Sequence, residues 1–146
     1  MDKVAFVCQK WHTMSIAPAT KPLIWMGSTR EVVRSFPKEV RDAVGFALFQ
    51  AQRGGKHVSA KPLRGFGGAG VLEVVEDHDG NTYRAVYTVK FRGAVYALHA
   101  FQKKSRRGIA TPKQEIGLIR ERLRRAEVHY AEWSTRREKS AGEDKD

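Results

Sequence analysis

The sequence predicts an α+β fold in which helices pack over a small antiparallel sheet. Three observations predict it: an early pair of helical segments, three consecutive strand-like segments separated by turn residues, and a final amphipathic helix. With 146 residues, the chain is long enough for one domain whose hydrophobic core needs no disulfide bond or metal ion. The predicted order is strand, helix, helix, three-strand meander, helix.

The first predicted elements are a strand and a short helix. Residues 23–27 form a short apolar run, which suits a strand. Ser28 and Glu31 then match a capping box, in which the Glu31 side chain reaches back to the amide of Ser28. This pattern predicts a helix over about residues 29–36.

A second helix and a loop follow. Pro37 suits a first helical position, and apolar residues recur at spacings of three and four until Gly54-Gly55. Residues 56–70 are basic, rich in glycine and without a period, which predicts a loop that crosses the surface.

Three strands are predicted over residues 71–76, 82–90 and 94–103. Asp79-Gly80 and Arg92-Gly93 mark tight turns between them, so we expect an antiparallel meander. The third segment is apolar at nearly every position, as expected of a central strand covered on both faces.

The last predicted element is an amphipathic helix. Thr111 and Gln114 match a second capping box, with Pro112 at the first helical position. The apolar stripe of this helix comprises Ile116, Ile119, Leu123, Ala126 and Tyr130.

The chain ends are predicted to lie outside the folded domain. Residues 1–21 show no clear period and are expected to form a weakly ordered extension. Residues 22–133 form the predicted domain. Residues 134–146 are charged and small, which predicts a disordered tail.

The composition indicates a polyanionic partner. The chain has 27 Lys+Arg against 16 Asp+Glu and a net charge of +11. Two stretches lack acidic residues: residues 53–70, with four basic side chains, and residues 84–113, with eight. A solvated surface normally mixes both signs, so these stretches predict a face shaped for phosphate groups. A generic solubilising surface is the alternative.

Several kinds of site are absent from the sequence. It has no GxxxxGK[ST] loop, no HExxH pair and no metal-ligand spacing, so we expect neither a cofactor nor a metal. Clustered carboxylates, which two-metal nucleases need, are also missing. The single cysteine, Cys8, cannot form an intrachain disulfide, and no apolar run reaches the length of a membrane span. We therefore expect a cytoplasmic protein with no membrane association.

The residues that suit RNA chemistry are cationic. The candidate catalytic residues are Arg84, Lys103, Lys104 and His99, and the candidate RNA-binding residues are Lys61, Arg64, Lys90, Arg106 and Arg107. A hairpin between the last two strands should bring Arg84 opposite about residues 101–103. An RNA 2′-hydroxyl can attack its own phosphodiester without a metal when a base, an acid and a cationic clamp surround the phosphate.

Structural roles remain open for these residues. Alternation along a strand sends Lys103 and Lys104 to opposite faces, so at most one of them should face a shared site. Arg84 also suits phosphate binding without a role in the transition state. His99 lies in an apolar strand, where a hydrogen-bonded core histidine is commoner than a catalytic one.

Two segments resemble the phage-derived branch of the RelE/HigB-like toxins, namely TYRAVYTVK and VYALHAFQKKSRRGIATPKQEIGLIRERLRRA. In that branch a strand ending in F-x-K-K leads into a T-P-x-x-E helix. Upstream, the segment KPLRGFGGAGVLEVVED is similar to the basic loop and second strand of the family, in which glycines precede an acidic residue, here Glu73. The resemblance covers about residues 23–130 and implies a RelE-like fold.

The resemblance also implies a function. It is that of a ribosome-dependent endoribonuclease that cleaves translated mRNA and is neutralised by a helix-turn-helix, HigA-like antitoxin. By position, Arg84 matches the arginine that stabilises phosphate charge, and Lys61 and Arg64 match loop residues that orient RNA. Lys103 and Lys104 occupy a strand end where related toxins keep acid, base or phosphate-contacting groups, and where several relatives have tyrosine or histidine instead.

Two other functions fit the same observations. A ParE-like toxin would share the fold but inhibit DNA gyrase by binding it, and the F-x-K-K strand end argues against this. A non-catalytic nucleic-acid-binding module would use the same basic face and would bind RNA with a steep dependence on salt.

Overall fold

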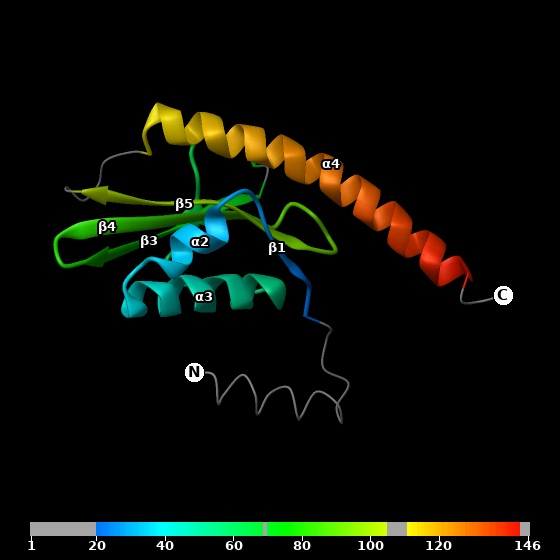
Figure 1. Cartoon of the computed structure of the whole chain (residues 1–146), viewed down its shortest axis with the longest axis horizontal. Helices are drawn as coiled ribbons and strands as arrows, with labels where there is room; N and C mark the ends of the chain where they lie inside the picture. The colour runs from blue at the N-terminus through cyan, green and yellow to red at the C-terminus, as the bar shows by residue number, and fades with distance from the viewer. Residues whose placement is uncertain (1–19, 69, 105–110, 144–146) are drawn as a thin grey trace, which may run out of the picture.

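A computed structural model describes residues 20–68, 70–104 and 111–143, which form one sheet between two helical layers (Figure 1). The elements are β1 (Leu23–Trp25), α2 (Thr29–Arg34), α3 (Lys38–Gln52), β2 (Ala60–Pro62), β3 (Val71–His78), β4 (Asn81–Thr88), β5 (Val95–Lys104) and α4 (Lys113–Glu143). The predicted α+β class and the order of the predicted elements are confirmed. No helix in the described part of the chain has the length and apolar character needed to cross a bilayer.

The sheet has the order β1-β5-β4-β3-β2. Strands β3, β4 and β5 form the predicted antiparallel meander, but β1 pairs with β5 in parallel, so the sheet is mixed. Asp79 and Gly80 both have positive φ, as expected of the predicted tight turn between β3 and β4. The predicted turn at Arg92-Gly93 is wrong in length, because residues 89–94 all lie between β4 and β5.

The predicted loop over residues 56–70 hides the short strand β2. Its three residues pair with β3 at the edge of the sheet, and Lys61 lies opposite Glu73. A strand this short has no visible alternation, and Pro62 suits an edge because it has no amide proton to donate to a further strand. The sequence therefore gives no strand signal here.

The helix ends differ from the predicted caps. Ser28 precedes α2 but makes no side-chain hydrogen bond to the helix, and Pro37 is the cap residue of α3 rather than its first helical residue. At the other end of the chain, α4 continues through residues 134–143, a stretch predicted to be a disordered tail. Its Arg, Glu, Lys and Ala residues all favour helix. Residues 1–19 lie outside the described part, so the predicted N-terminal extension stays a prediction.

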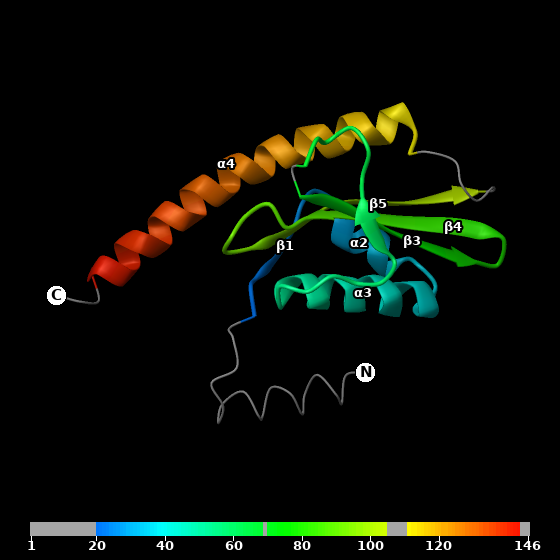
Figure 2. The ribbon, with the colours of Figure 1, turned by 180° about the vertical axis from the view of Figure 1, so that it is seen from behind.

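Apolar residues cover both faces of the sheet. Helices α2 and α3 lie on one face, and α4 lies on the other with residues 63–66 of the loop that follows β2 (Figures 1 and 2). Every residue of β5 from Val95 to Phe101 is buried, which confirms the expected interior strand. The α4 layer packs through Ile119, Leu123 and Ala126, which are buried at the spacing of one helical face.

Ile119 tests the energetic contribution of this helix. Its side chain is fully buried, so Ile119→Ala should lower the free energy of unfolding by about 2–5 kcal/mol in urea titrations followed by circular dichroism. The matched control is Gln114→Ala at an exposed position of the same helix, which should change it by less than about 0.5 kcal/mol. Equal effects of the two substitutions would show that α4 does not dock on the sheet.

Candidate functional site

A buried ion pair lies under α4 on the sheet. Arg84 of β4 and Glu73 of β3 have side chains that are 5% and 7% exposed. One guanidinium nitrogen, Nη1, lies 3.2 Å from Oε2 and 3.4 Å from Oε1 of Glu73. The pairing is diagonal, because Arg84 lies opposite Val75 in the strand register. Arg84 is therefore already engaged by a carboxylate and does not lie at the surface.

Thr111 joins this pair to the segment that enters α4. Its hydroxyl accepts a hydrogen bond from Nη1 of Arg84 at 3.3 Å and donates one to Oε2 of Glu73 at 3.2 Å. The predicted capping role of Thr111 is thus wrong, since α4 begins at Lys113 and the hydroxyl is used by the sheet. The three side chains fix the start of α4 over the middle of β3 and β4.

A β-bulge in β5 determines which residues share this face. Val86 lies opposite His99 but Tyr87 lies opposite Ala97, so Leu98 is an extra residue. Before the bulge, Val95 and Ala97 face α3, whereas after it Ala100 does. His99, Phe101 and Lys103 consequently lie on the α4 face. In a strand of the same length with regular alternation, all three would lie on the other side.

His99 is held between two charged residues of α4. Its Nε2 contacts Glu115, and its Nδ1 lies 3.1 Å from Nη1 of Arg122. A guanidinium can only donate, so Nδ1 must be the acceptor and Nε2 must carry the ring proton, which it donates to Glu115. His99 is therefore neutral in this arrangement. Burial lowers its pKa, and Arg122 lowers it further, against the opposing effect of Glu115.

Arg122 connects three parts of the chain. Its Nη1 also lies 2.9 Å from the carbonyl oxygen of Leu98 and 3.2 Å from the hydroxyl of Thr29 at the start of α2. The guanidinium packs against Gly27, where an added Cβ would lie 2.7–2.9 Å from its atoms. Gly27 also has a φ of +56°, so the turn after β1 is built for glycine. Burial lowers the pKa of Arg122, which nevertheless stays charged.

The predicted cations form a partial rim around this cluster. Lys103 lies opposite Thr82 on the α4 face and is half-buried, and Lys61 lies on the same face in the edge strand and is exposed. Arg64 is exposed in the turn after β2. The side chain of Lys104 and the residues Arg106 and Arg107 lie outside the described part, so their predicted roles stay predictions.

Lys90 does not belong to this rim. It follows the opposite end of β4 from Lys103, and its Nζ forms an ion pair with Glu127 of α4 at 2.8 Å. Its predicted contact with RNA is not tested by this position and stays a prediction.

The sequence interpretation left four members of the cluster out of the candidate site. These are Glu73, Thr111, Glu115 and Arg122. Glu73 carried a signal, because it interrupts an otherwise apolar strand beside a strand that contains an arginine. Arg122 gave no signal in the sequence, since it is one of many arginines in a basic helix. Within the described ranges, no three His, Cys, Asp or Glu side chains are arranged to hold a metal ion.

A family model matches residues 31–124 of the chain, from α2 to the first part of α4, and its description is phage-derived protein Gp49-like (DUF891). The chain belongs to this Gp49-like family. No curated protein and no solved structure matches it. The family region of this Gp49-like chain includes the buried ion pair, the bulge and the Glu115–His99–Arg122 contacts. The cluster is thus part of the family domain rather than of the regions that flank it.

The Arg84–Glu73 ion pair should behave as a coupled buried pair. Arg84→Met leaves a buried carboxylate and should lower the free energy of unfolding by about 3–5 kcal/mol. The double variant Arg84→Met/Glu73→Leu should recover most of this loss, because no buried charge remains. Urea unfolding of the four proteins of this cycle measures the coupling, and additive losses would contradict it.

The neutral state of His99 should make stability depend on pH. Its pKa is lowered in the folded state, so the unfolded chain binds the proton more readily as pH falls below about 6.5. Stability should therefore fall between about pH 7 and pH 5.5, and less steeply in His99→Gln. Nitrogen NMR of the imidazole should show the Nε2–H tautomer, and a protonated ring at neutral pH would contradict the arrangement.

Proposed function

We propose that this chain is the toxin of a type II toxin–antitoxin module and a metal-independent, ribosome-dependent mRNA endoribonuclease that inhibits translation. The observation that carries the proposal is the asymmetry of the sheet. The α3 face is packed with apolar side chains, whereas the α4 face also holds two polar groups, Arg84 in contact with Glu73 and His99 in contact with Glu115 and Arg122 of α4. Burying such groups costs free energy that apolar residues would not, so their presence supports a functional role.

The first contacts with RNA are assigned to the exposed cations. Lys61 and Arg64 at one edge, and Lys103 near the end of β5, lie where a phosphodiester backbone can reach them. Arg84 lies behind them and is shielded by Thr111. Direct contact between Arg84 and a phosphate requires the start of α4 to shift. In the conformation described, Arg84 acts by holding Glu73 and Thr111 in place.

Proton transfer is assigned to the pair formed by Glu115 and His99. Both ring nitrogens of His99 are engaged, so the imidazole exchanges a proton only with Glu115. The Glu115 side chain is 29% exposed, against 10% for His99, and is the member that solvent and substrate reach. Glu115 would accept the 2′-hydroxyl proton as the 2′-oxygen bonds to phosphorus, and Lys103 would give a proton to the 5′-oxygen as its bond to phosphorus breaks. The loop cations would stabilise the charge on the phosphate. This chemistry uses only groups of the chain.

The partners follow from the same proposal. A protein of net charge +11 that acts on translated mRNA would work in the cytoplasm, at the ribosome. Its neutralising partner would be a helix-turn-helix, HigA-like antitoxin that offers acidic residues to the rim of Lys61, Arg64 and Lys103.

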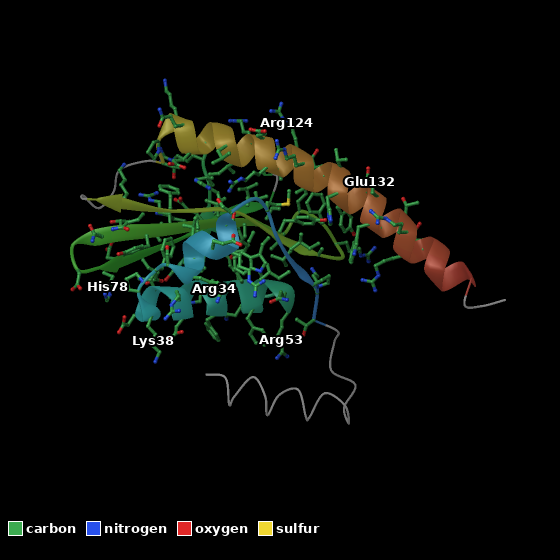
Figure 3. All side chains as sticks on the ribbon, in the orientation of Figure 1. Arg34, Lys38, Arg53, His78, Arg124 and Glu132 are labelled. Atoms are coloured by element: carbon green, nitrogen blue, oxygen red, sulfur yellow. The ribbon has the colours of Figure 1, made fainter. Side chains whose placement is uncertain are left out.

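Mapping of RNA 5′ ends during controlled expression in bacteria tests the proposal. The parent chain should arrest growth and produce new ends within translated messages. Lys103→Ala and Glu115→Gln should each reduce these cuts at least about tenfold without loss of fold. The matched control is Lys38→Ala on the opposite side of the molecule, which should cut like the parent protein (Figure 3).

The other outcomes separate the alternative functions. Growth arrest with DNA-damage signalling and no new RNA ends would replace the proposal with gyrase inhibition of the ParE kind. RNA binding with a steep salt dependence and no cleavage would replace it with a non-catalytic module. Variants of Arg84 are informative here only after unfolding measurements, because the residue is buried in an ion pair.

A further inference from the structure

The outer side of α4 carries an exposed apolar side chain together with charges of both signs. Ile119, Leu123 and Ala126 face the sheet, while the exposed residues Arg124, Val128, Ala131 and Thr135 recur at spacings of four, three and four on the other side of the helix. Val128 is 61% exposed and is one of three large apolar side chains that lie exposed among the described residues.

Two shallow hollows lie along this outer side. One is lined by Arg124, Arg125, Val128, His129 and Glu132, and the other by Ala131, Glu132, Thr135 and Arg136. They follow each other along the helix and share Glu132. Together they span about 18 Å of helix, from residue 124 to residue 136. A second helix is the shape that fits such a strip.

The charges of the strip argue against a nucleic acid and for a protein. Glu121 and Glu132 lie among Arg124, Arg125 and Arg136, so the strip mixes both signs, whereas a polyanion favours cations alone. Arg125 is paired with Glu121 on the same helix at 2.8 Å. Arg124 and Glu132 form no ion pair with any described residue and are directed to solvent from α4 (Figure 3).

The charge order is self-complementary about Val128. Arg124 lies four residues before Val128 and Glu132 lies four residues after it. If two copies of α4 lie antiparallel with Val128 against its own copy, Arg124 of each faces Glu132 of the other. Glu121 falls opposite Thr135, and Arg136 falls opposite Arg120, so the complementary charges are those of Arg124 and Glu132. A two-fold interface requires this reciprocity, in which one patch matches itself.

The shape of the molecule permits this pairing. The sheet and helices α2 and α3 lie on one side of α4, and none of the residues that the structure describes covers the other side (Figures 1 and 2). A two-fold axis through the outer side therefore places the two bodies on opposite sides of the helix pair. We propose that this surface of α4, residues 121–136, is a homodimer interface in which two copies pack antiparallel about Val128.

Charge reversal tests the interface. The mass of the full chain should rise with protein concentration toward that of a dimer in sedimentation or light-scattering measurements. Arg124→Glu and Glu132→Arg each place like charges together twice and should weaken dimerisation by at least about tenfold. The double variant Arg124→Glu/Glu132→Arg restores both opposite-charge pairs and should dimerise like the parent chain. The matched controls Arg34→Glu and Glu31→Arg on α2 should have no effect.

A crosslink provides an independent measurement. In a Cys8→Ser background, Val128→Cys should form a disulfide between copies under mild oxidation, because the residue lies at the two-fold axis. Val58→Cys, at a residue that is 95% exposed, reports random collision. A monomer at all concentrations, with Val128→Cys no faster than Val58→Cys, would overturn the proposal and leave the strip to another protein. A dimer that both single reversals leave intact would overturn it equally.

Discussion

Burial of the sheet on both faces is the constraint on which the rest of this structure depends. Strand β5 is buried from Val95 to Phe101 and is apolar except for His99, so neither of its faces can be left to water. Helices α2 and α3 cover one face. Leu63 and Phe66 cover part of the other, and the rest is covered after the last strand, when α4 folds back across it. The final helix is therefore as necessary to the core as the strands, although it follows them all.

Apolar packing alone does not define where α4 lies. Ile119, Leu123 and Ala126 make apolar contacts, which have no preferred direction. A helix can slide on such a surface at little cost in free energy. The hydrogen bonds of Arg122 and Thr111 have fixed geometry and hold the helix in one register over the sheet. The polar cluster thus specifies the position that the apolar contacts stabilise, and the same side chains are available for chemistry.

Patterns that extend over several residues predicted the fold. The contacts that a single side chain makes with another part of the chain were not predicted. The Asp79-Gly80 turn fixed the register of its hairpin, and the expected pairing of Arg84 with residues near 101 is confirmed. The ion pair with Glu73 was missed because a diagonal neighbour across strands is not visible in a linear pattern. The partners of His99 come from α4, whose position over the sheet is a tertiary property.

The bulge at Leu98 has a consequence for comparisons among relatives. Three site residues, His99, Phe101 and Lys103, face α4 because one additional residue shifts the phase of the strand. A relative that lacks the residue at Leu98 would have a regular strand and would still present those side chains to α4, whereas a relative of the same length without the bulge would turn them to the opposite layer. Chain length between Ala94 and Lys103 therefore bears on this site as much as residue identity does. An alignment of such a shorter relative that places its gap at either end of the strand would match residues that do not share a face.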